Sequence, residues 1–195
     1  MPAGRHVHVD SRLPQLLDAA ARRFCQQGYG GATMREIAAD VGMQPGSLYS
    51  HFDTKEALLL AVYVRGVDQI CEAVQGALTP HSEPWSRLEA ACVAHLEAVL
   101  RDDDFARVVV RVKPDDVPLA RDSLIAQRDR YETIWHALVA ALPLGRRADR
   151  RALRLLLLGG MNGAQHWYRA DGALTPRNLA RHFVALLRQP HEVSA

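Results

Sequence analysis

The stretch from Thr33 to His51 constrains the fold of this chain more than any other, because it encodes two short helices around a tight turn. Thr33 and Glu36 stand three residues apart and predict a capping box. In such a box the threonine hydroxyl accepts the Glu36 N–H, and the carboxylate returns to the Thr33 N–H. Gly42 follows the first helix, where a residue that tolerates positive φ is favoured. Pro45 suits the first turn of the second helix, because its missing N–H is no loss there.

The second helix of this pair has one apolar and one polar face. Leu48 and Phe52, four residues apart, share the inward face. The outward face consists of Pro45, Gly46, Ser47, Tyr49, Ser50 and His51. Side chains this small and polar suit a helix that enters the major groove of DNA and bonds phosphates at the rim of the groove. The alternative is an ordinary helical hairpin with no nucleic-acid role.

A longer pattern around the hairpin resembles the N-terminal domain of TetR/AcrR-type bacterial transcriptional regulators. The matching residues are Phe24, Gly28-Tyr29, Thr33, Ile37-Ala38, Val41-Gly42, Leu48-Tyr49, His51-Phe52, Lys55 and Leu58. The resemblance implies that a helix from Gln44 to Ser50 lies in the major groove of an operator. The residues expected at base edges are Pro45, Gly46 and Ser47, those expected at phosphates are Thr33, Tyr49, His51 and Lys55, and Arg35 and Gln44 complete the expected DNA-binding set.

The remainder of the chain predicts an all-α fold. Ala, Leu and Arg are abundant and long segments lack Gly and Pro, which favours helix. At 195 residues the chain can bury a sizeable core. We expect about nine helices. They form a helix-turn-helix DNA-binding domain over residues 1–55, with a loose arm over 1–10, and a C-terminal ligand-binding and dimerisation domain over 56–195. The formal net charge of +2 does not by itself indicate a nucleic-acid binder.

Two helices of the second domain carry further expectations. Asp53 to Glu56 predicts a second capping box, which opens a helix that runs to about residue 76 and reaches into both domains. Another helix is expected over residues 149–170. TetR-type proteins dimerise through their last two helices, and the resemblance places a dimer seam there. Its expected residues are Gly159, Gly160, Gly163, Ala164, Phe183 and Leu187. The alternative is close packing of these residues within one subunit.

The run from Met161 to Gly172 resembles the subgroup of these regulators that responds to acyl-CoA thioesters. Trp167 and Arg169, with nearby amides, could stack on a nucleotide head group and pair with it. The expected ligand-binding residues are Arg128, Tyr131, Asn162, His166, Trp167 and Arg169. The alternative is that Trp167 and Arg169 only end a helix at the surface.

Missing signals disfavour several other classes of protein. The sequence has no nucleophile elbow, zinc-protease, Walker or dinucleotide-binding motif, so we expect no enzyme, no metal site and no cofactor. Cys25, Cys71 and Cys92 are widely spaced, which is typical of buried thiols in a reducing cytoplasm. The longest uncharged run, fourteen residues from Leu155, is too short and too polar to span a bilayer.

Together these features predict a ligand-responsive DNA-binding transcriptional regulator in the cytoplasm, and repression is the commoner mode in the family. Its expected partners are a palindromic double-stranded DNA operator, a second copy of the chain and a small-molecule effector, with no membrane. Two rival hypotheses remain: an all-α enzyme with a merely structural hairpin, and an all-α adaptor or small-molecule-binding protein without DNA binding. Failure to bind any genomic DNA would favour the adaptor.

Overall fold

The computed structural model describes residues 12–188, and the predicted arm over residues 1–10 lies outside them. Within these residues the chain is all-α, as expected, with nine α-helices, three short 3-10 helices and no strand. The α-helices are α1 (Leu13–Gly31), α2 (Met34–Asp40), α3 (Pro45–Tyr49), α4 (Lys55–Leu78), α5 (Pro84–Leu100), α6 (Asp104–Arg111), α7 (Arg121–Ala140), α8 (Arg150–Gly163) and α9 (Pro176–Arg188). The 3-10 helices are η1 (Pro114–Asp116), η2 (Pro118–Ala120) and η3 (Ala164–His166).

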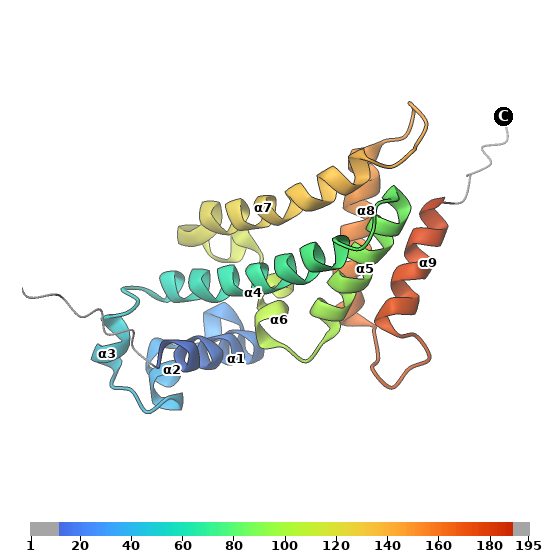
Figure 1. Ribbon diagram of the computed structural model, residues 1–195. Coiled ribbons are helices and arrows are strands. Elements are labelled where there is room, and N and C mark those ends of the chain that lie inside the picture. Colours follow the sequence, from blue (N-terminus) through green and yellow to red (C-terminus); the bar gives the residue numbers. More distant parts are fainter. Residues whose placement is uncertain (1–11, 189–195) are drawn as a thin grey trace, which may run out of the picture.

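Figure 1 shows α1, α2 and α3 at one end of the molecule, α8 and α9 at the other, and α4 running between the two ends. The first three helices and the first two turns of α4 are termed the reading head, and the helices from α5 onward are termed the body. None of the helices in residues 12–188 combines the length and the apolar character that crossing a membrane requires.

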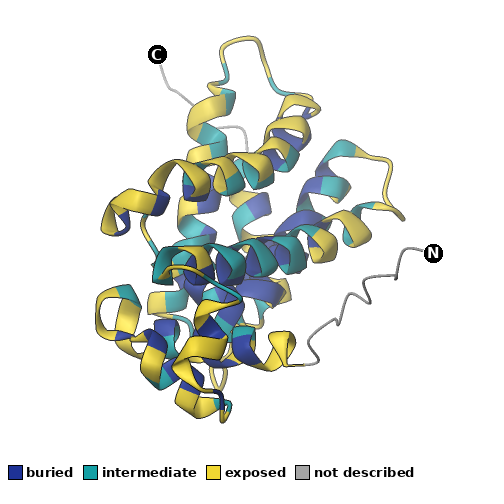
Figure 2. Ribbon diagram, turned by 90° about the vertical axis from the view of Figure 1, so that its left-hand side faces the viewer, coloured by how far each residue is buried: buried dark blue, intermediate teal, exposed yellow. Residues whose placement is uncertain are grey.

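The reading head packs around an apolar core. Its fully buried side chains include Leu16, Ile37, Leu48, Leu58 and Leu59. Apolar residues recur every three or four positions, which places them on the inner side of each helix. Figure 2 shows this division, with buried residues turned inward and exposed residues turned to solvent. Leu48 is the one buried side chain of α3, so this short helix covers the core through a single anchor.

Glycine and proline lie at or near several helix ends, and Gly42 and Pro45 lie where the sequence predicted them. Gly42, two residues after the end of α2, adopts a φ of 63°, and Gly28 adopts a φ of 70° and bends α1 near its end. Both angles are costly for residues that carry a Cβ. Pro45, Pro84 and Pro176 are the first residues of α3, α5 and α9. These local signals fix the order of the elements without help from the tertiary structure.

The two predicted capping boxes require corrections. Thr33 accepts the Glu36 N–H at 3.2 Å as expected, but the Glu36 carboxylate accepts from the Thr33 hydroxyl at 2.6 Å in place of the backbone N–H. The second box is wrong, because Thr54 rather than Asp53 caps α4. The Thr54 hydroxyl accepts the N–H of residue 57 at 3.1 Å. This shift leaves the next carboxylate, that of Glu56, available for a contact with α1.

Helix α4 belongs to both cores, as its predicted length implied. Its first half contributes Leu58 and Val62 to the core of the reading head, and its second half contributes Ile70 and Val74 to the core of the body. Helix α6 crosses α4 at Gly66. A Cβ at this position would lie 2.7 Å from the Val109 side chain and 2.8 Å from the Phe105 carbonyl oxygen. The two helices are therefore in backbone contact.

The core of the reading head extends beyond the predicted domain boundary at residue 55. Phe105 and Val108 of α6, Val117 between η1 and η2, and Leu124 of α7 all pack into it. Each of these four side chains is at most 7% exposed. The body therefore completes the apolar interior of the reading head, and the boundary itself remains a prediction.

The helix expected over residues 149–170 is shorter than predicted. α8 ends at Gly163, η3 follows, and the chain turns at Trp167. The Gln165 side chain donates to the Val99 carbonyl oxygen of α5 at 2.8 Å, and this tertiary bond holds the turn against the body. The physical reason for the error is that no local signal in the sequence reports a bond to a residue so far away in the chain.

Candidate nucleic-acid interface and effector cavity

Helix α3 turns its polar face to solvent. Gln44, Pro45, Gly46 and Ser47 are exposed, and Tyr49 keeps 49% of its surface accessible. Nothing in the described part of the chain covers this face, which Figure 1 shows at the far end of the molecule. A helix presented in this way can approach the edges of bases while its apolar side stays in the core.

The residues predicted to bond phosphates lie around α3. Thr33 and Arg35 are exposed at the start of α2, which packs against α3. His51 follows α3 and is half-buried. The Thr33 hydroxyl is already engaged with Glu36. Arg35 is therefore the exposed cation of this set, and the phosphate contacts themselves remain predictions.

Lys55 has a structural position that the sequence did not reveal. Its ammonium donates to the carbonyl oxygens of Tyr29, at 2.8 Å, and Ala32, at 3.0 Å, and it lies 4.3 Å from the centre of the Tyr29 ring. The Tyr29 hydroxyl donates to the Glu56 carboxylate next to it. These contacts join the end of α1 to the start of α4. Two of the three Lys55 N–H groups therefore bond to carbonyl groups of the protein itself. The sequence had predicted that this ammonium faces a DNA phosphate, and that contact remains a prediction.

The same cluster shifts the ionisation of two groups. Burial, together with the bond to Glu56, raises the pKa of Tyr29 to about 12. The hydrogen bond from Tyr29 lowers the pKa of Glu56. Tyr29 is therefore a neutral donor and Glu56 a charged acceptor at physiological pH, which strengthens the contact between α1 and α4.

A cavity of about 210 Å³ lies within the body, bounded by α4, α5, α6, α7 and α8. Its aliphatic lining includes Val67, Ile70, Val99, Val109, Val110 and Leu158. His95, Tyr131 and Asn162 contribute polar groups to the inner wall, and Tyr63 of α4 lines the cavity as well. A largely apolar cavity with a few convergent polar groups is typical of a small-molecule site.

The polar wall is a continuous chain of hydrogen bonds. His95 Nδ1 lies 2.6 Å from the Tyr131 hydroxyl, and His95 Nε2 lies 3.0 Å from Asn162 Oδ1. Trp135 meets the edges of the His95 and Tyr131 rings. Burial lowers the pKa of His95 to about 4, and the Asn162 bond opposes this only in part. His95 is therefore neutral at physiological pH.

Charged side chains lie at the border of the cavity. Lys113 and Arg128 are exposed cations there, and Glu132 is half-buried. Arg128 pairs with Asp129 at 3.0 Å and with Glu132 at 3.6 Å, and Glu132 also pairs with Arg154 of α8. Lys113 has no ion pair within residues 12–188. It is therefore available to an anionic group of a ligand.

The predicted ligand set divides into two groups. Arg128, Tyr131 and Asn162 line the cavity together. His166, Trp167 and Arg169 do not line it: Trp167 is 51% exposed and Arg169 pairs with a neighbouring aspartate at 3.1 Å on the surface, and their role in ligand binding remains a prediction. The cause is the early end of α8, which turns these side chains away from the interior. The sequence prediction missed His95, Val99 and Lys113. The one available signal was a histidine at position 95 within the otherwise apolar stretch from Ala90 to Leu96.

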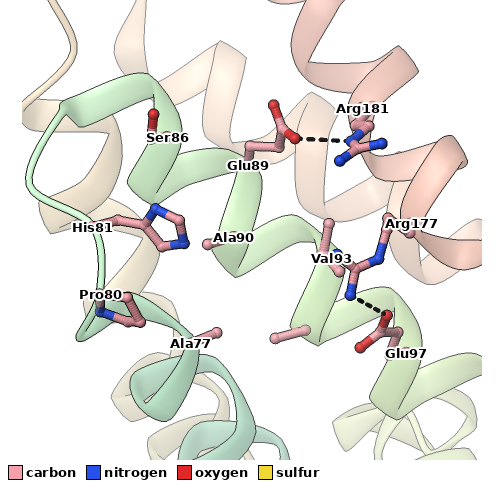
Figure 3. A pocket seen from close by; sticks show the side chains of 11 residues that line it. Ala77, Pro80, His81, Ser86, Glu89, Ala90, Val93, Glu97, Arg177 and Arg181 are labelled. Atoms are coloured by element: carbon pink, nitrogen blue, oxygen red, sulfur yellow. Dashed lines mark hydrogen bonds and ion pairs between the residues drawn. The ribbon is translucent and has the colours of Figure 1, made fainter.

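Two larger hollows, each of about 430 Å³, are surface grooves. Figure 3 shows the first, between α5, α9 and the loop before α5, where ion pairs join Glu89 to Arg181 at 3.1 Å and Glu97 to Arg177 at 3.6 Å. The second is lined by Arg101, Arg107 and Arg111, together with Gln165 and Tyr168. Val99 lines both this arginine groove and the apolar cavity. The cavity and the arginine groove are therefore neighbours.

The last two long helices expose an apolar face. Leu155 and Leu156 of α8 are 49% and 69% exposed, and Leu186 of α9 is 58% exposed. Of the predicted seam residues, Gly159 is open, Gly160, Gly163, Phe183 and Leu187 are half-buried, and Ala164 is fully buried. η3 packs Ala164 inside its own subunit, which is the alternative that the sequence left open for these residues. The seam itself remains a prediction.

Comparison with known proteins identifies the family. A model of the tetracyclin repressor-like C-terminal domain matches residues 81–190, and a model of bacterial regulatory proteins of the tetR family matches residues 16–62. The chain belongs to the tetR family. It is thus a ligand-responsive, DNA-binding transcriptional regulator with the helix-turn-helix and helical body that the sequence predicted.

Individual relatives resemble the regulator to different extents. The transcriptional activator FasR of Mycolicibacterium smegmatis is 37% identical, but the match spans only 54% of this chain and 48% of FasR. The transcriptional repressor KstR2 of Rhodococcus jostii is 27% identical over 97% of this chain and 98% of KstR2. Among solved structures, AibR in complex with isovaleryl coenzyme A and operator DNA has a TM-score of 0.78 and 27% identity, covering 90% of this chain and 97% of that one.

Proposed function

We propose that this regulator represses transcription as a homodimer that binds a roughly palindromic operator through α3. The observation that carries the proposal is the exposed polar face of α3, anchored by the buried Leu48. Pro45, Gly46 and Ser47 approach base edges, and Tyr49 and Arg35 bond phosphates, which position the reader without specifying sequence. A repressor is favoured over an activator because the relative that matches nearly the whole chain, KstR2, is named a repressor.

The dimer forms through α8 and α9. Leu155, Leu156 and Leu186 would lose their exposure in such a contact, and Gly159 would let the partner's helix approach closely. Burial of large apolar side chains is the main favourable term in protein association. Two-fold symmetry then sets the two copies of α3 at successive faces of one duplex, one or more helical turns apart. The regulator works in the cytoplasm, where its DNA lies, and carries out no catalysis.

The effector is an acyl-CoA thioester with a short acyl group. The acyl group would occupy the apolar cavity, whose volume of about 210 Å³ is below the roughly 300–1,000 Å³ of most drug-sized sites. The phosphates would lie in the arginine groove, which is separated from the cavity by Val99. Arginine pairs well with phosphate oxygens. The complex of AibR with isovaleryl coenzyme A supports the same ligand class.

Helix α4 couples the two sites. It lines the cavity through Tyr63, Val67 and Ile70 and enters the core of the reading head through Leu58 and Val62. A ligand that displaces α4 would change the separation of the two copies of α3. A coupling free energy of about 1–3 kcal/mol corresponds to a roughly 5–150-fold loss of operator affinity.

Selection of genomic fragments by the purified protein tests this proposal. The bound fragments should share a palindrome, and isovaleryl-CoA should release them in a gel shift while raising the melting temperature by mass action. If no genomic sequence is enriched above background, the proposal that this regulator binds an operator is contradicted. A panel of CoA thioesters without effect on either measurement would remove the effector class alone.

A further inference from the structure

The chain of hydrogen bonds through His95 is an unusual feature of an otherwise aliphatic wall. His95 is 1% exposed and is the one buried polar side chain of the described residues. Burying a polar group costs free energy unless it is bonded, and an aliphatic side chain would fill the same space without that cost. The chain reaches the cavity at both ends, through Tyr131 and Asn162, so it presents bonding groups to whatever occupies the cavity.

The donors and acceptors of this chain can be assigned one by one. Asn162 Oδ1 faces His95 Nε2, so the ring nitrogen donates and the amide oxygen accepts. A neutral histidine has only one N–H, so Nδ1 accepts and the Tyr131 hydroxyl donates to it. This leaves the Asn162 amide nitrogen, which carries two N–H groups and has no partner within the described residues. The cavity therefore has a donor fixed in its wall, oriented from behind by His95.

We propose that Asn162 recognises the carbonyl oxygen of the effector and that His95 and Tyr131 are positioning residues that hold the amide in this orientation. The ligand is thus a carbonyl compound, a thioester or a free carboxylic acid, with a short apolar body. This inference rests on the proposed effector site. The aliphatic side chains of Val67, Ile70 and Leu158 surround the apolar body.

Charge at the border of the cavity sets the direction in which the ligand enters. Lys113 is exposed there and has no ion pair within residues 12–188. Arg128 lies one helical turn before Tyr131 on α7, on the same side of the cavity. In a thioester, the carbonyl group would reach Asn162 while the phosphates stay outside the cavity, in the arginine groove. In a free acid, the carboxylate itself would meet Asn162, and the cations at the border would balance its charge.

A pair of ligands that differ only in the carbonyl tests the proposal. The first probe is isovaleryl-CoA and the second is its thioether, isopentyl-CoA, in which a methylene group replaces the carbonyl. Calorimetric titration of the full-length wild-type protein should show binding of the thioester about tenfold or more tighter, because the thioether leaves the Asn162 N–H groups unbonded. Isovalerate serves as the third probe and distinguishes a free acid from a thioester as the source of the carbonyl.

The Asn162→Leu variant, similar in volume but without the donor, should bind thioester and thioether alike. Tyr131→Phe should reduce the preference partially, because the histidine loses its donor and no longer fixes the amide. Trp167→Ala should keep the wild-type preference and serves as the matched control, since this side chain lies outside the cavity. The wild-type comparison needs no variant, so misfolding of a variant does not remove the test.

The outcomes separate this inference from the function on which it rests. Equal binding of thioester and thioether by the wild-type protein overturns the role of Asn162 and leaves the ligand class standing. Binding of none of the three probes overturns both. A preference for the thioester that Asn162→Leu retains also overturns the assignment, because the discrimination would then come from another group.

Discussion

The reading head and the body of this regulator are built on different principles. In the reading head, residues close together in sequence fix the geometry: Gly42 and Pro45 set the turn, and Leu48 anchors α3. In the body, the working cavity is assembled from five helices, and its polar wall joins residues 95, 131 and 162. The reading head can therefore be recognised from a short motif, whereas the proposed effector site is assembled only in the folded chain.

The difference also concerns what each region offers to a ligand. The reading head exposes its functional residues and keeps its aliphatic ones inside. The body also keeps most of its aliphatic side chains inside, but it buries a polar residue with them, His95, at 1% exposure. A DNA-binding surface forms its contacts in the presence of solvent. A small-molecule cavity excludes water, so that an unbonded polar group of a wrong ligand costs more free energy there. The four predictions below test this contrast, from the largest expected effect to the smallest.

Two leucines on α7 test whether the core of the reading head depends on the body. Leu124 packs into the core of the reading head and Leu138 into that of the body, and both are at most 5% exposed. Each change to alanine should lower the free energy of unfolding by about 2–5 kcal/mol. Leu124→Ala should in addition speed amide exchange in α1 to α3 and weaken operator binding, and Leu138→Ala should not. Identical exchange patterns in the two variants would contradict the division into two cores.

Acid should destabilise the body through His95. Its pKa is about 4 in the folded protein against 6.5 ordinarily, so the unfolded chain takes up a proton that the folded chain refuses. Stability therefore falls as the pH drops from about 6.5 towards about 4. Between pH 7 and pH 5 the free energy of unfolding, measured with urea, should fall by about 2 kcal/mol more in the wild type than in His95→Gln. Losses of equal size would mean that the imidazole titrates normally.

Replacement of Lys55 by methionine tests its role between α1 and α4. Loss of the bonds to the carbonyl oxygens of residues 29 and 32 should lower the free energy of unfolding by about 1–2 kcal/mol. Operator affinity should fall while the slope of log K against log salt stays unchanged, because no phosphate contact is lost. Arg35→Met, at an exposed cation of α2, should instead lower that slope by about 1. A reduced slope in Lys55→Met would restore its assignment to a phosphate.

Two aromatic residues of equal exposure give the smallest expected effect. Tyr49 is 49% exposed on α3, and Trp167 is 51% exposed at the turn that follows α8. Tyr49→Ala should weaken binding to operator and unrelated DNA alike by about tenfold, or about 1.4 kcal/mol, since it removes one bond to a phosphate. Trp167→Ala should leave both affinities unchanged in a gel shift. Unaltered DNA affinity of Tyr49→Ala would remove the residue from the interface.

The sequence predicted much of the fold because its signals are local. Gly42 and Pro45 mark the turn between α2 and α3 where the structure has it, and Thr33 caps α2. The errors arise where a distant contact decides. The bond from Gln165 to Val99 ends α8 early. The bonds from the Lys55 ammonium to the carbonyl groups at the end of α1 were likewise not predictable from the motif, and its phosphate contact remains a prediction.

The candidate sites follow the same rule. The exposed face of α3 was predictable residue by residue. In this five-residue helix the one large aliphatic side chain, Leu48, points to the core, and the remaining residues face solvent. The cavity was predicted in part, through Arg128, Tyr131 and Asn162. His95 could not be singled out from the sequence, because its importance lies in two partners that are 36 and 67 positions away in the chain. No period or spacing in the sequence reports such a triad.

The shared core has a practical consequence for anyone who would join this DNA reader to a foreign sensor. A chimaera cut after residue 55 would deprive the transplanted part of Leu58 and Leu59 as well as Phe105, Val108 and Leu124, and would open its apolar interior to water. Helix α6 crosses α4 at Gly66 in backbone contact, so a foreign body would also need a helix that crosses position 66 equally closely. A working transplant therefore has to carry α4, α6 and the start of α7 with it. New ligand specificity is better sought by changing individual cavity residues than by exchanging whole modules.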